Sequence, residues 1–171
     1  STDPIFTGVN VFRAELDGTQ ITDPVVISTT LPNTVTGYFS NEPTGVAFNP
    51  DNGHLFFSDD SGAVAIYQLD PGIDNKYNTN DDNLITRNAA DFGFVDPEGV
   101  AYGQNHLFIA DGIGNKVYNI DLGSDGAFGG IPPINGEVVA VVDTFALGIT
   151  VLEGVEFDPL RLFDGRSVQL L

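Results

Sequence analysis

A motif that recurs three times at nearly constant spacing constrains this chain more than any other feature. Its glycine stands at Gly45, Gly99 and Gly154, which are 54 and 55 residues apart in a chain of 171 residues. Repeats of this length indicate supersecondary units that stack on one another, because a single unit cannot bury its own apolar surface. The three copies of the motif occupy residues 42–48, 96–102 and 152–157.

Further apolar segments follow each copy of the motif in the same order. They are short, rich in Val, Ile, Phe and Tyr, and separated by many of the 20 glycines and 10 prolines, a pattern typical of strands and turns. The segment 138–147 fits a strand better than a helix, because its first half is β-branched and it lacks helical periodicity. The second segments lie at 54–57, 106–109 and 161–163, the third at 11–15, 65–70, 116–121 and 167–171, and the fourth at 24–30, 83–88 and 137–144.

Four strands in a unit of about 50 residues predict an all-β fold of β-propeller blades, each a sheet of four antiparallel strands. A β-sandwich also has short strands, but it does not produce three copies in the same register. We interpret residues 1–171 as a single, partial propeller domain of about three blades. Its repeats lie near 42–95, 96–151 and 152–171, and residues 1–41 supply the outer strands of a preceding blade.

Propellers typically have about four to eight blades, so about three blades leave the ring open. The chain is then either half of a six-bladed ring made by two copies or a piece of a longer propeller. A third alternative is a filament in which edge strands of one copy complete a blade of the next. The partners we expect are therefore a second copy of this chain or the rest of a longer propeller.

The net charge of the chain restricts the classes of ligand that it can bind. The sequence has 24 acidic and 6 basic residues, a net charge of −18, and no cysteine. So few basic residues argue against binding to nucleic acid, and no apolar run is long enough to insert into a membrane. The absence of cysteine excludes disulfides and thiolate chemistry. Cations are the ligands that this composition favours.

The second and third copies of the motif also resemble a known group of proteins. The resemblance rests on a Pro-Glu-Gly-Val run at 97–100 with a partial copy at 153–155, followed by a Leu-Phe strand and a Gly-Asn-x-Val-Tyr strand at 114–118. These residues resemble secreted bacterial β-propellers related to the β-propeller phytases and their esterase-like relatives. More loosely, they are similar to the six-bladed gluconolactonase and NHL-repeat propellers. The resemblance covers about residues 42–157.

The resemblance implies calcium ions held by carboxylates near the propeller axis. Glu98 and Glu153 match the acidic position of the motif, whereas the first copy has Thr44 there. A metal-dependent phosphoesterase or lactonase would use Glu98 and Glu153 together with Asp111 as its candidate catalytic residues. The alternative is that these carboxylates accept backbone N–H bonds at the tight turns.

The strongest chemical signal is an acidic loop at residues 70–82. It contains four Asp and three Asn within thirteen residues. Calcium prefers six to eight oxygen ligands from carboxylates, amides and backbone carbonyls, and a short acidic loop supplies them. The loop lacks the glycine and glutamate positions of an EF-hand, and a solvated turn made of Asx-turns is the alternative. The predicted calcium ligands are Asp70, Asp74, Asn78, Asp81 and Asp82.

Weaker candidates occupy equivalent places in the repeats. Asp121 and Asp125 belong to a second, degenerate copy of the acidic loop. His54 and His106 share one repeat position at a strand start, which indicates a structural role. The acids that end the second segments, Ser58-Asp59-Asp60 and Ala110-Asp111-Gly112, are turn residues or secondary cation ligands.

Together these observations predict a calcium-binding β-propeller module that is used for binding or self-assembly, as a surface, matrix or filament component. The alternative is a calcium-dependent hydrolase of the phytase-like, esterase-like or lactonase type. We expect a secreted or cell-surface location and interpret Ser1 as a terminus left by signal cleavage, unless the chain is a fragment.

Overall fold

The computed structural model describes residues 11–17, 20–27, 39–40, 42–77, 79–129, 133–158 and 168–170. These residues form an all-β fold, as predicted, with one short α-helix, α1 (Ala89–Phe92), and one 3₁₀ turn (Phe145–Leu147). No helix in these ranges is long and apolar enough to cross a membrane.

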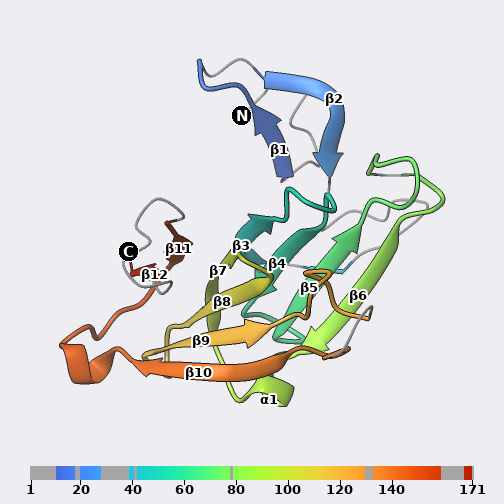
Figure 1. Ribbon diagram of the computed structural model, residues 1–171. Helices are drawn as coiled ribbons and strands as arrows, with labels where there is room; N and C mark the ends of the chain where they lie inside the picture. Colours follow the sequence, from blue (N-terminus) through green and yellow to red (C-terminus); the bar gives the residue numbers. More distant parts are fainter. Residues whose placement is uncertain are drawn as a thin grey trace.

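Two four-stranded antiparallel sheets form the centre of the molecule (Figure 1). In each sheet the strands follow one another in chain order, which confirms the four-strand unit of the repeat. The first sheet contains β3 (Pro43–Phe48), β4 (Leu55–Asp59), β5 (Ala65–Asp70) and β6 (Asn83–Asn88). The second contains β7 (Pro97–Gly103), β8 (His106–Asp111), β9 (Lys116–Asp121) and β10 (Glu137–Asp143).

The two ends of the described chain contribute one hairpin each. β1 (Val11–Ala14) pairs with β2 (Gln20–Ile27), and β11 (Val155–Phe157) pairs with β12 (Val168–Leu170). We read residues 167–171 as a third strand, but Leu170 pairs directly with Val155 of β11, in the place of a second strand. The predicted second strand at 161–163 lies outside the described residues.

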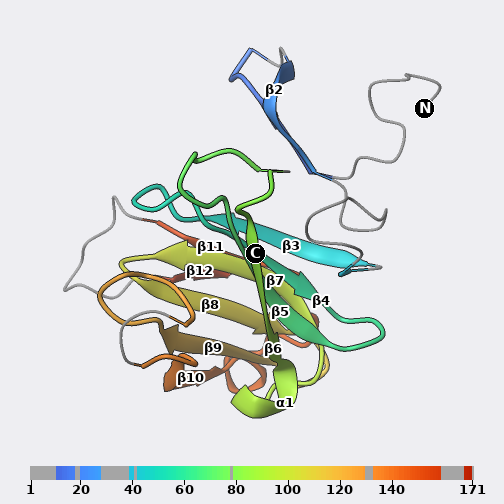
Figure 2. The same ribbon diagram turned by 90° about the vertical axis from the view of Figure 1, so that its right-hand side faces the viewer.

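The middle strands β4, β5 and β8 are buried on both faces, whereas the outer strands β6 and β10 are largely exposed. Successive side chains of a strand point to opposite faces. Phe56 of β4 therefore packs between the two sheets, whereas its neighbour Phe57 packs on the far face of the first sheet. In the second sheet, Ile109 faces the core between the sheets and Phe108 faces β11. Figure 2 shows this stacking of the sheets from the side.

The repeat glycines allow the first strands of successive units to approach closely. A Cβ atom added to Gly45 would lie 2.8 Å from the backbone nitrogen of Val100, and one added to Gly99 would lie 2.8 Å from the Cα of Gly154. Real Cβ atoms do not make such contacts, so only glycine fits there. This packing brings the C-terminal end of β4 next to the N-terminal end of β7, where three acidic side chains meet. Within the described residues the sheets do not form a closed ring.

Candidate cation sites

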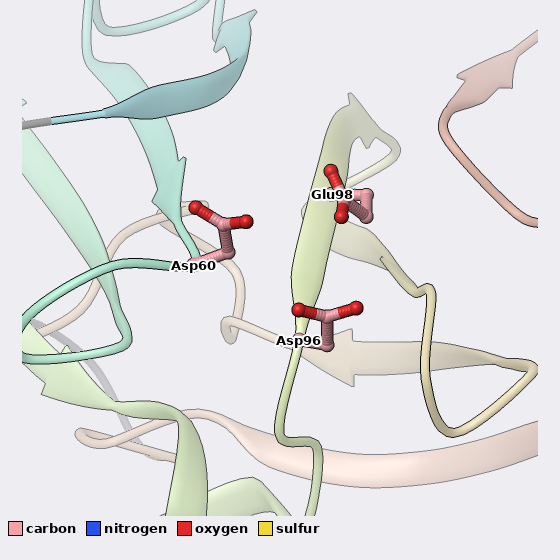
Figure 3. Close-up of side chains that lie close together, drawn as sticks. All are labelled: Asp60, Asp96 and Glu98. Atoms are coloured by element: carbon pink, nitrogen blue, oxygen red, sulfur yellow. The ribbon is translucent and has the colours of Figure 1, made fainter.

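Three carboxylates meet where β4 ends and β7 begins. Asp60 follows β4, Asp96 precedes β7, and Glu98 lies within β7. One oxygen atom from each of the three lies within 4.8 Å of the others, and all three residues are half-buried. Figure 3 shows the three side chains in this region, with Asp60 reaching from the first sheet toward the second. We call these residues the acidic cluster.

The turn between β8 and β9 holds Asp96 in place. The backbone N–H of Asp96 donates to Oδ1 of Asp111 (3.1 Å), and its carbonyl accepts the N–H of Gly112 (2.9 Å). Its side-chain Oδ2 accepts the N–H of Ile113 (2.9 Å). A Cβ atom at Gly112 would lie 2.8 Å from both Asp96 Oδ2 and Glu98 Cγ, so glycine leaves the room that the carboxylates occupy.

Among the described residues, no basic side chain forms an ion pair with the acidic cluster. Burial is the largest cause that raises the pKa of Glu98, and the charges of Asp96, Asp60, Glu153 and Glu42 raise it further. The Oδ1 atom of Asp60 is buried without a hydrogen-bond partner. A buried carboxylate oxygen without a hydrogen bond is costly, and a bound cation would offset this cost.

Internal basic residues do not neutralise this charge in the described part of the chain. The ion pair between His54 Nε2 and Asp70 Oδ1 (3.4 Å) lies outside the acidic cluster and involves neither lysine nor arginine. The chemistry of the acidic cluster, three carboxylates with no cation, matches what a hard divalent metal requires.

The three candidate catalytic residues differ in their relation to the acidic cluster. Glu98 belongs to the acidic cluster, and Glu153 acts on it through its charge. Asp111 is 1% exposed and its Oδ1 accepts the N–H groups of Asp96 and Gly114, so it is a turn residue that supports the cluster from behind. Thr44 occupies the place of the glutamate in the first repeat.

At the motif position that holds glutamate in the other repeats, Thr44 has a structural role. Its hydroxyl hydrogen-bonds to Ser58 (3.0 Å) and to the carbonyl of Pro97 (2.6 Å), which joins the first sheet to the second. The sequence pattern does not select Asp96 as a site residue, and it leaves Asp60 as either a turn residue or a secondary cation ligand. Asp96 begins a copy of the motif and Asp60 follows a second strand. Their positions indicate a shared site only when the packing of the two repeats is known.

The acidic loop at residues 70–82 uses its carboxylates to bind its own backbone. Oδ1 of Asp70 accepts the N–H of Gly72 (2.9 Å), and Oδ1 of Asp74 accepts the N–H of Lys76 (2.9 Å). Oδ2 of Asp81 accepts the N–H of Ile73 (2.7 Å). The bonds of Asp70 and Asp74 are Asx-turn bonds, which a short acidic loop makes with or without a metal, whereas the bond of Asp81 joins the two ends of the loop. Asn78 lies outside the described residues.

The hydroxyl of Thr79 lies among several oxygen atoms of this loop. Its Oγ1 is 2.7 Å from Asp81 Oδ1, 3.2 Å from Asp82 Oδ1, 3.4 Å from Asp74 Oδ1 and 3.2 Å from the carbonyl of Lys76. The hydroxyl has one proton and can donate it to one of them only. The bond from Thr79 is the largest cause that lowers the pKa of Asp81. Calcium binding by Asp70, Asp74, Asn78, Asp81 and Asp82 stays a prediction.

The second acidic loop connects the two sheets. Asp121 Oδ1 accepts the N–H of Gly123 (2.8 Å). The backbone carbonyl of Asp125 accepts Asn52 Nδ2 (3.0 Å), and that of Gly126 accepts Asn49 Nδ2 (3.1 Å). The loop therefore packs against the turn between β3 and β4, and a calcium role for Asp121 and Asp125 stays a prediction.

The two histidines have different partners. His54 is buried beside Asp70, and burial lowers its pKa more than the charges of Asp70 and Asp125 raise it. His106 Nδ1 lies 2.7 Å from Asn119 Oδ1. Neither histidine belongs to the acidic cluster.

Comparison with known proteins finds no family model that matches this chain and no curated protein that matches it significantly. The resemblance to secreted propellers therefore depends only on the motifs at residues 42–157.

Proposed function

We propose that this chain is a calcium-binding segment of a secreted β-propeller that serves in binding or self-assembly. The observation that carries the proposal is the acidic cluster: three carboxylate oxygens within 4.8 Å of one another, one residue of which has a buried oxygen with no partner. Calcium takes oxygen ligands in flexible geometry and would neutralise the repulsion among Asp60, Asp96 and Glu98.

The propeller part of the proposal is supported by the way that the repeats stack. The first strand of the second sheet packs on that of the first through Gly45, and the third repeat packs on the second through Gly99 in the same manner. A stacking that repeats between successive four-stranded sheets is what a propeller requires. About three repeats cannot complete a ring, so a second copy or the rest of a longer chain would complete it.

Calcium, rather than magnesium, fits both acidic regions. Magnesium demands near-octahedral geometry and keeps several waters, whereas calcium accepts many oxygen ligands at variable angles. The oxygens around Thr79 in the acidic loop would make a second site of this kind. Half-exposed carboxylate sites suit the weak affinities, about 10⁻⁴ to 10⁻³ M, of extracellular calcium modules.

Thermal unfolding in EDTA and in millimolar calcium tests the proposal. We expect calcium to raise the melting temperature, with a stabilisation of about 2.7 kcal/mol when calcium is at a hundredfold its dissociation constant. Asp96→Asn should lose most of this gain, because it removes one charge from the acidic cluster and keeps the side-chain shape. Asp91→Asn, an exposed residue of α1, is the matched control and should keep the gain.

Equal melting temperatures in EDTA and calcium would refute the calcium proposal. If Asp81→Asn removes the gain and Asp96→Asn does not, calcium binds in the acidic loop and not in the cluster. Analytical ultracentrifugation tests self-assembly separately. We expect a dimer or a larger species, and a stable monomer at all concentrations would remove that part of the proposal.

A hydrolase is the second candidate, and the raised pKa of Glu98 favours it because general acids need such a shift. A screen of phosphate esters and lactones in calcium tests it. Loss of turnover in Glu98→Gln, in a variant that folds normally, would support catalysis. Turnover that is unchanged in this variant would exclude Glu98 as the catalytic acid.

A further inference from the structure

The glycine of the third repeat differs from the first two in what lies against it. A Cβ atom added to Gly45 or to Gly99 would lie 2.8 Å from the backbone of the next repeat's first strand or of the glycine before it. Within the described residues, a Cβ atom added to Gly154 would have no neighbour within 4 Å. Gly154 therefore has the same stacking position as the other two glycines, but no further first strand lies against it in this part of the chain.

The valine that follows each glycine shows what is exposed at the other end of the stack. Val46, Val100 and Val155 share one position of the repeat. Val100 is 5% exposed and Val155 is 8% exposed, because each packs on the repeat before it. Val46 is 53% exposed, and so is Phe48, whereas Tyr102 at the position of Phe48 packs against the core between the sheets.

Both exposed side chains of β3 lie on the face of the first sheet that points away from the second. Val46 is paired with Phe57 and Phe48 with Leu55, and residues directly opposite each other share a face. Phe57 and Leu55 belong to the apolar cluster on that far face. β1 packs against the same cluster through Val11, but Val46 and Phe48 stay half exposed.

The second sheet exposes its fourth strand instead of its first. Val117 of β9 is buried against β11, on the face that points away from the first sheet. Val142 of β10 is paired with Val117 and therefore shares that face, yet it is 44% exposed. The first sheet is thus uncovered at its first strand and the second sheet at its fourth strand.

The two hairpins at the ends of the described chain are complementary halves of one unit. β11 is the first strand of the third repeat, and β12 pairs with it as a second strand. β1 and β2 match the third and fourth segments of the repeat. Within the described residues each hairpin pairs only with itself. The hairpins pack on opposite ends of the two-sheet stack, and a ring of only three units, in which they would meet, is smaller than the about four blades of the smallest propellers.

We propose that two copies of this chain close into one ring, in which Gly154 of each copy stacks on Gly45 and Val46 of the other. Hairpin β11–β12 of one copy and hairpin β1–β2 of the other then form a complete four-stranded sheet. This sheet covers Phe48 of one copy and Val142 of the other. The inference rests on the propeller part of the proposed function and is independent of calcium.

The number of strands favours a closed dimer over a filament. The described residues form twelve strands, which is three units of four. Two copies give six units, within the range of about four to eight blades, whereas three copies would give nine. A two-fold ring also uses the same junction twice and leaves no free end for further copies.

Disulfide crosslinking tests the junction on the full chain, which has no cysteine of its own. We expect Gly154→Cys and Val46→Cys, refolded together and oxidised, to form a covalent dimer on a non-reducing gel. Neither variant should crosslink by itself, because the two positions meet only between copies. Ile73→Cys is the matched control for Val46→Cys, because Ile73 is 95% exposed in the acidic loop and should not crosslink to Gly154→Cys.

A chain with both cysteines distinguishes the ring from a filament. A closed dimer gives a covalent dimer and no larger species, whereas a filament gives a ladder of higher multiples. A ladder, no crosslinked dimer in the mixture, or equal crosslinking to Ile73→Cys would each overturn the inference.

Sedimentation in EDTA gives a second, independent measurement. We expect the native chain to be a dimer, and Gly154→Leu should weaken dimerisation at least tenfold, because its side chain would collide with the first strand of the other copy. Circular dichroism should be unchanged, since the position is open within the described chain. Phe48→Ser should also weaken the dimer, whereas Ile73→Ser should not. A dimer that is unaffected by Gly154→Leu would overturn the inference.

The outcomes also separate this inference from the proposed function. A crosslinked dimer whose melting temperature does not respond to calcium would support the ring and remove the calcium proposal. Self-association without the Gly154 crosslink would overturn the ring and leave self-assembly through another surface. A calcium-stabilised monomer would overturn the ring and leave a propeller that the rest of a longer chain completes.

Discussion

In the acidic loop at residues 70–82 every described aspartate accepts hydrogen bonds from the loop itself, whereas in the acidic cluster three carboxylates face one another across two sheets. Both regions are built from carboxylates, but the pKa of a carboxylate is shifted in opposite directions in the two regions. Hydrogen bonds lower the pKa of Asp81, while burial and neighbouring charges raise the pKa of Glu98. Donors within reach, and not the number of acids, decide whether a carboxylate group is satisfied or requires an added cation.

The largest expected effects come from a pair of glycines, one in each region. Gly72 has a φ angle of +68°, and a Cβ atom there would lie 2.6 Å from the backbone oxygen of Asp81. Gly72→Ala should therefore reduce the free energy of unfolding by about 2–3 kcal/mol. Gly112→Ala meets only side-chain atoms at 2.8 Å, so it should cost about 1–2 kcal/mol. Urea unfolding measures both changes.

The same two glycine variants should distinguish calcium binding at the two proposed sites. Gly112→Ala displaces Asp96 and Glu98 and should weaken calcium binding by the acidic cluster about tenfold, an effect of about 1.4 kcal/mol. Gly72→Ala should leave the cluster's affinity unchanged. The comparison between the regions would fail if isothermal titration calorimetry gave the reverse pattern.

A smaller effect is expected at the hydroxyl of Thr79. In EDTA, Thr79→Ala removes the proton that Asp81 accepts and should lower the free energy of unfolding by about 1 kcal/mol. Thr79→Ser keeps a hydroxyl at the same place and should retain most of the stability. Thermal unfolding of the two variants measures this difference, and equal losses would show that the hydroxyl does not satisfy the loop.

The smallest effects are changes of stability with pH in EDTA, and they should have opposite signs. Folding raises the pKa of Glu98, so this carboxyl group ionises at a lower pH in the unfolded chain than in the folded chain. The contribution of Glu98 to folding stability is therefore present below the usual glutamate pKa and is lost as pH rises through the pKa of the folded state. The pKa of Asp81 is lowered, so its contribution is present above the usual aspartate value and is lost as pH falls through the folded value.

Melting curves between about pH 3 and pH 8 check both signs. Relative to the native chain, Glu98→Gln should gain stability as pH rises toward neutrality. Asp81→Asn should lose stability over the same interval, by a smaller amount because Asp81 is exposed and solvent screens its interactions. Shifts of the same sign in both variants would contradict the proposed contrast.

Most of the strand pattern could be predicted from the repeat, and only part of the site could. The third and fourth strands of both sheets begin and end within about a residue of the predicted segments, as β5 (Ala65–Asp70) and β9 (Lys116–Asp121) show. The acidic loop could also be predicted, because its residues are contiguous in sequence. Asp60 and Asp96 belong to different repeats, and nothing local indicates that they meet.

The pairing of the last described strand, β12, could not be predicted from the sequence either. Residues 167–171 alternate polar and apolar side chains and fit any strand of a sheet, so the pattern alone does not say which neighbour they pair with. The structure pairs Leu170 with Val155. Periodicity identifies strands, whereas register and order depend on contacts between distant residues.

The sequence by itself determined the all-β class, the four-strand unit and the bounds of most strands. These follow from local physics: β-branched and aromatic runs lie between glycines and prolines. Tertiary structure alone decided that Asp60, Asp96 and Glu98 share one place and that Thr44 joins the sheets. The reason is that these residues meet only when glycines such as Gly45 let the sheets pack together, and the electrostatic cost of gathering carboxylates exists only after that contact forms.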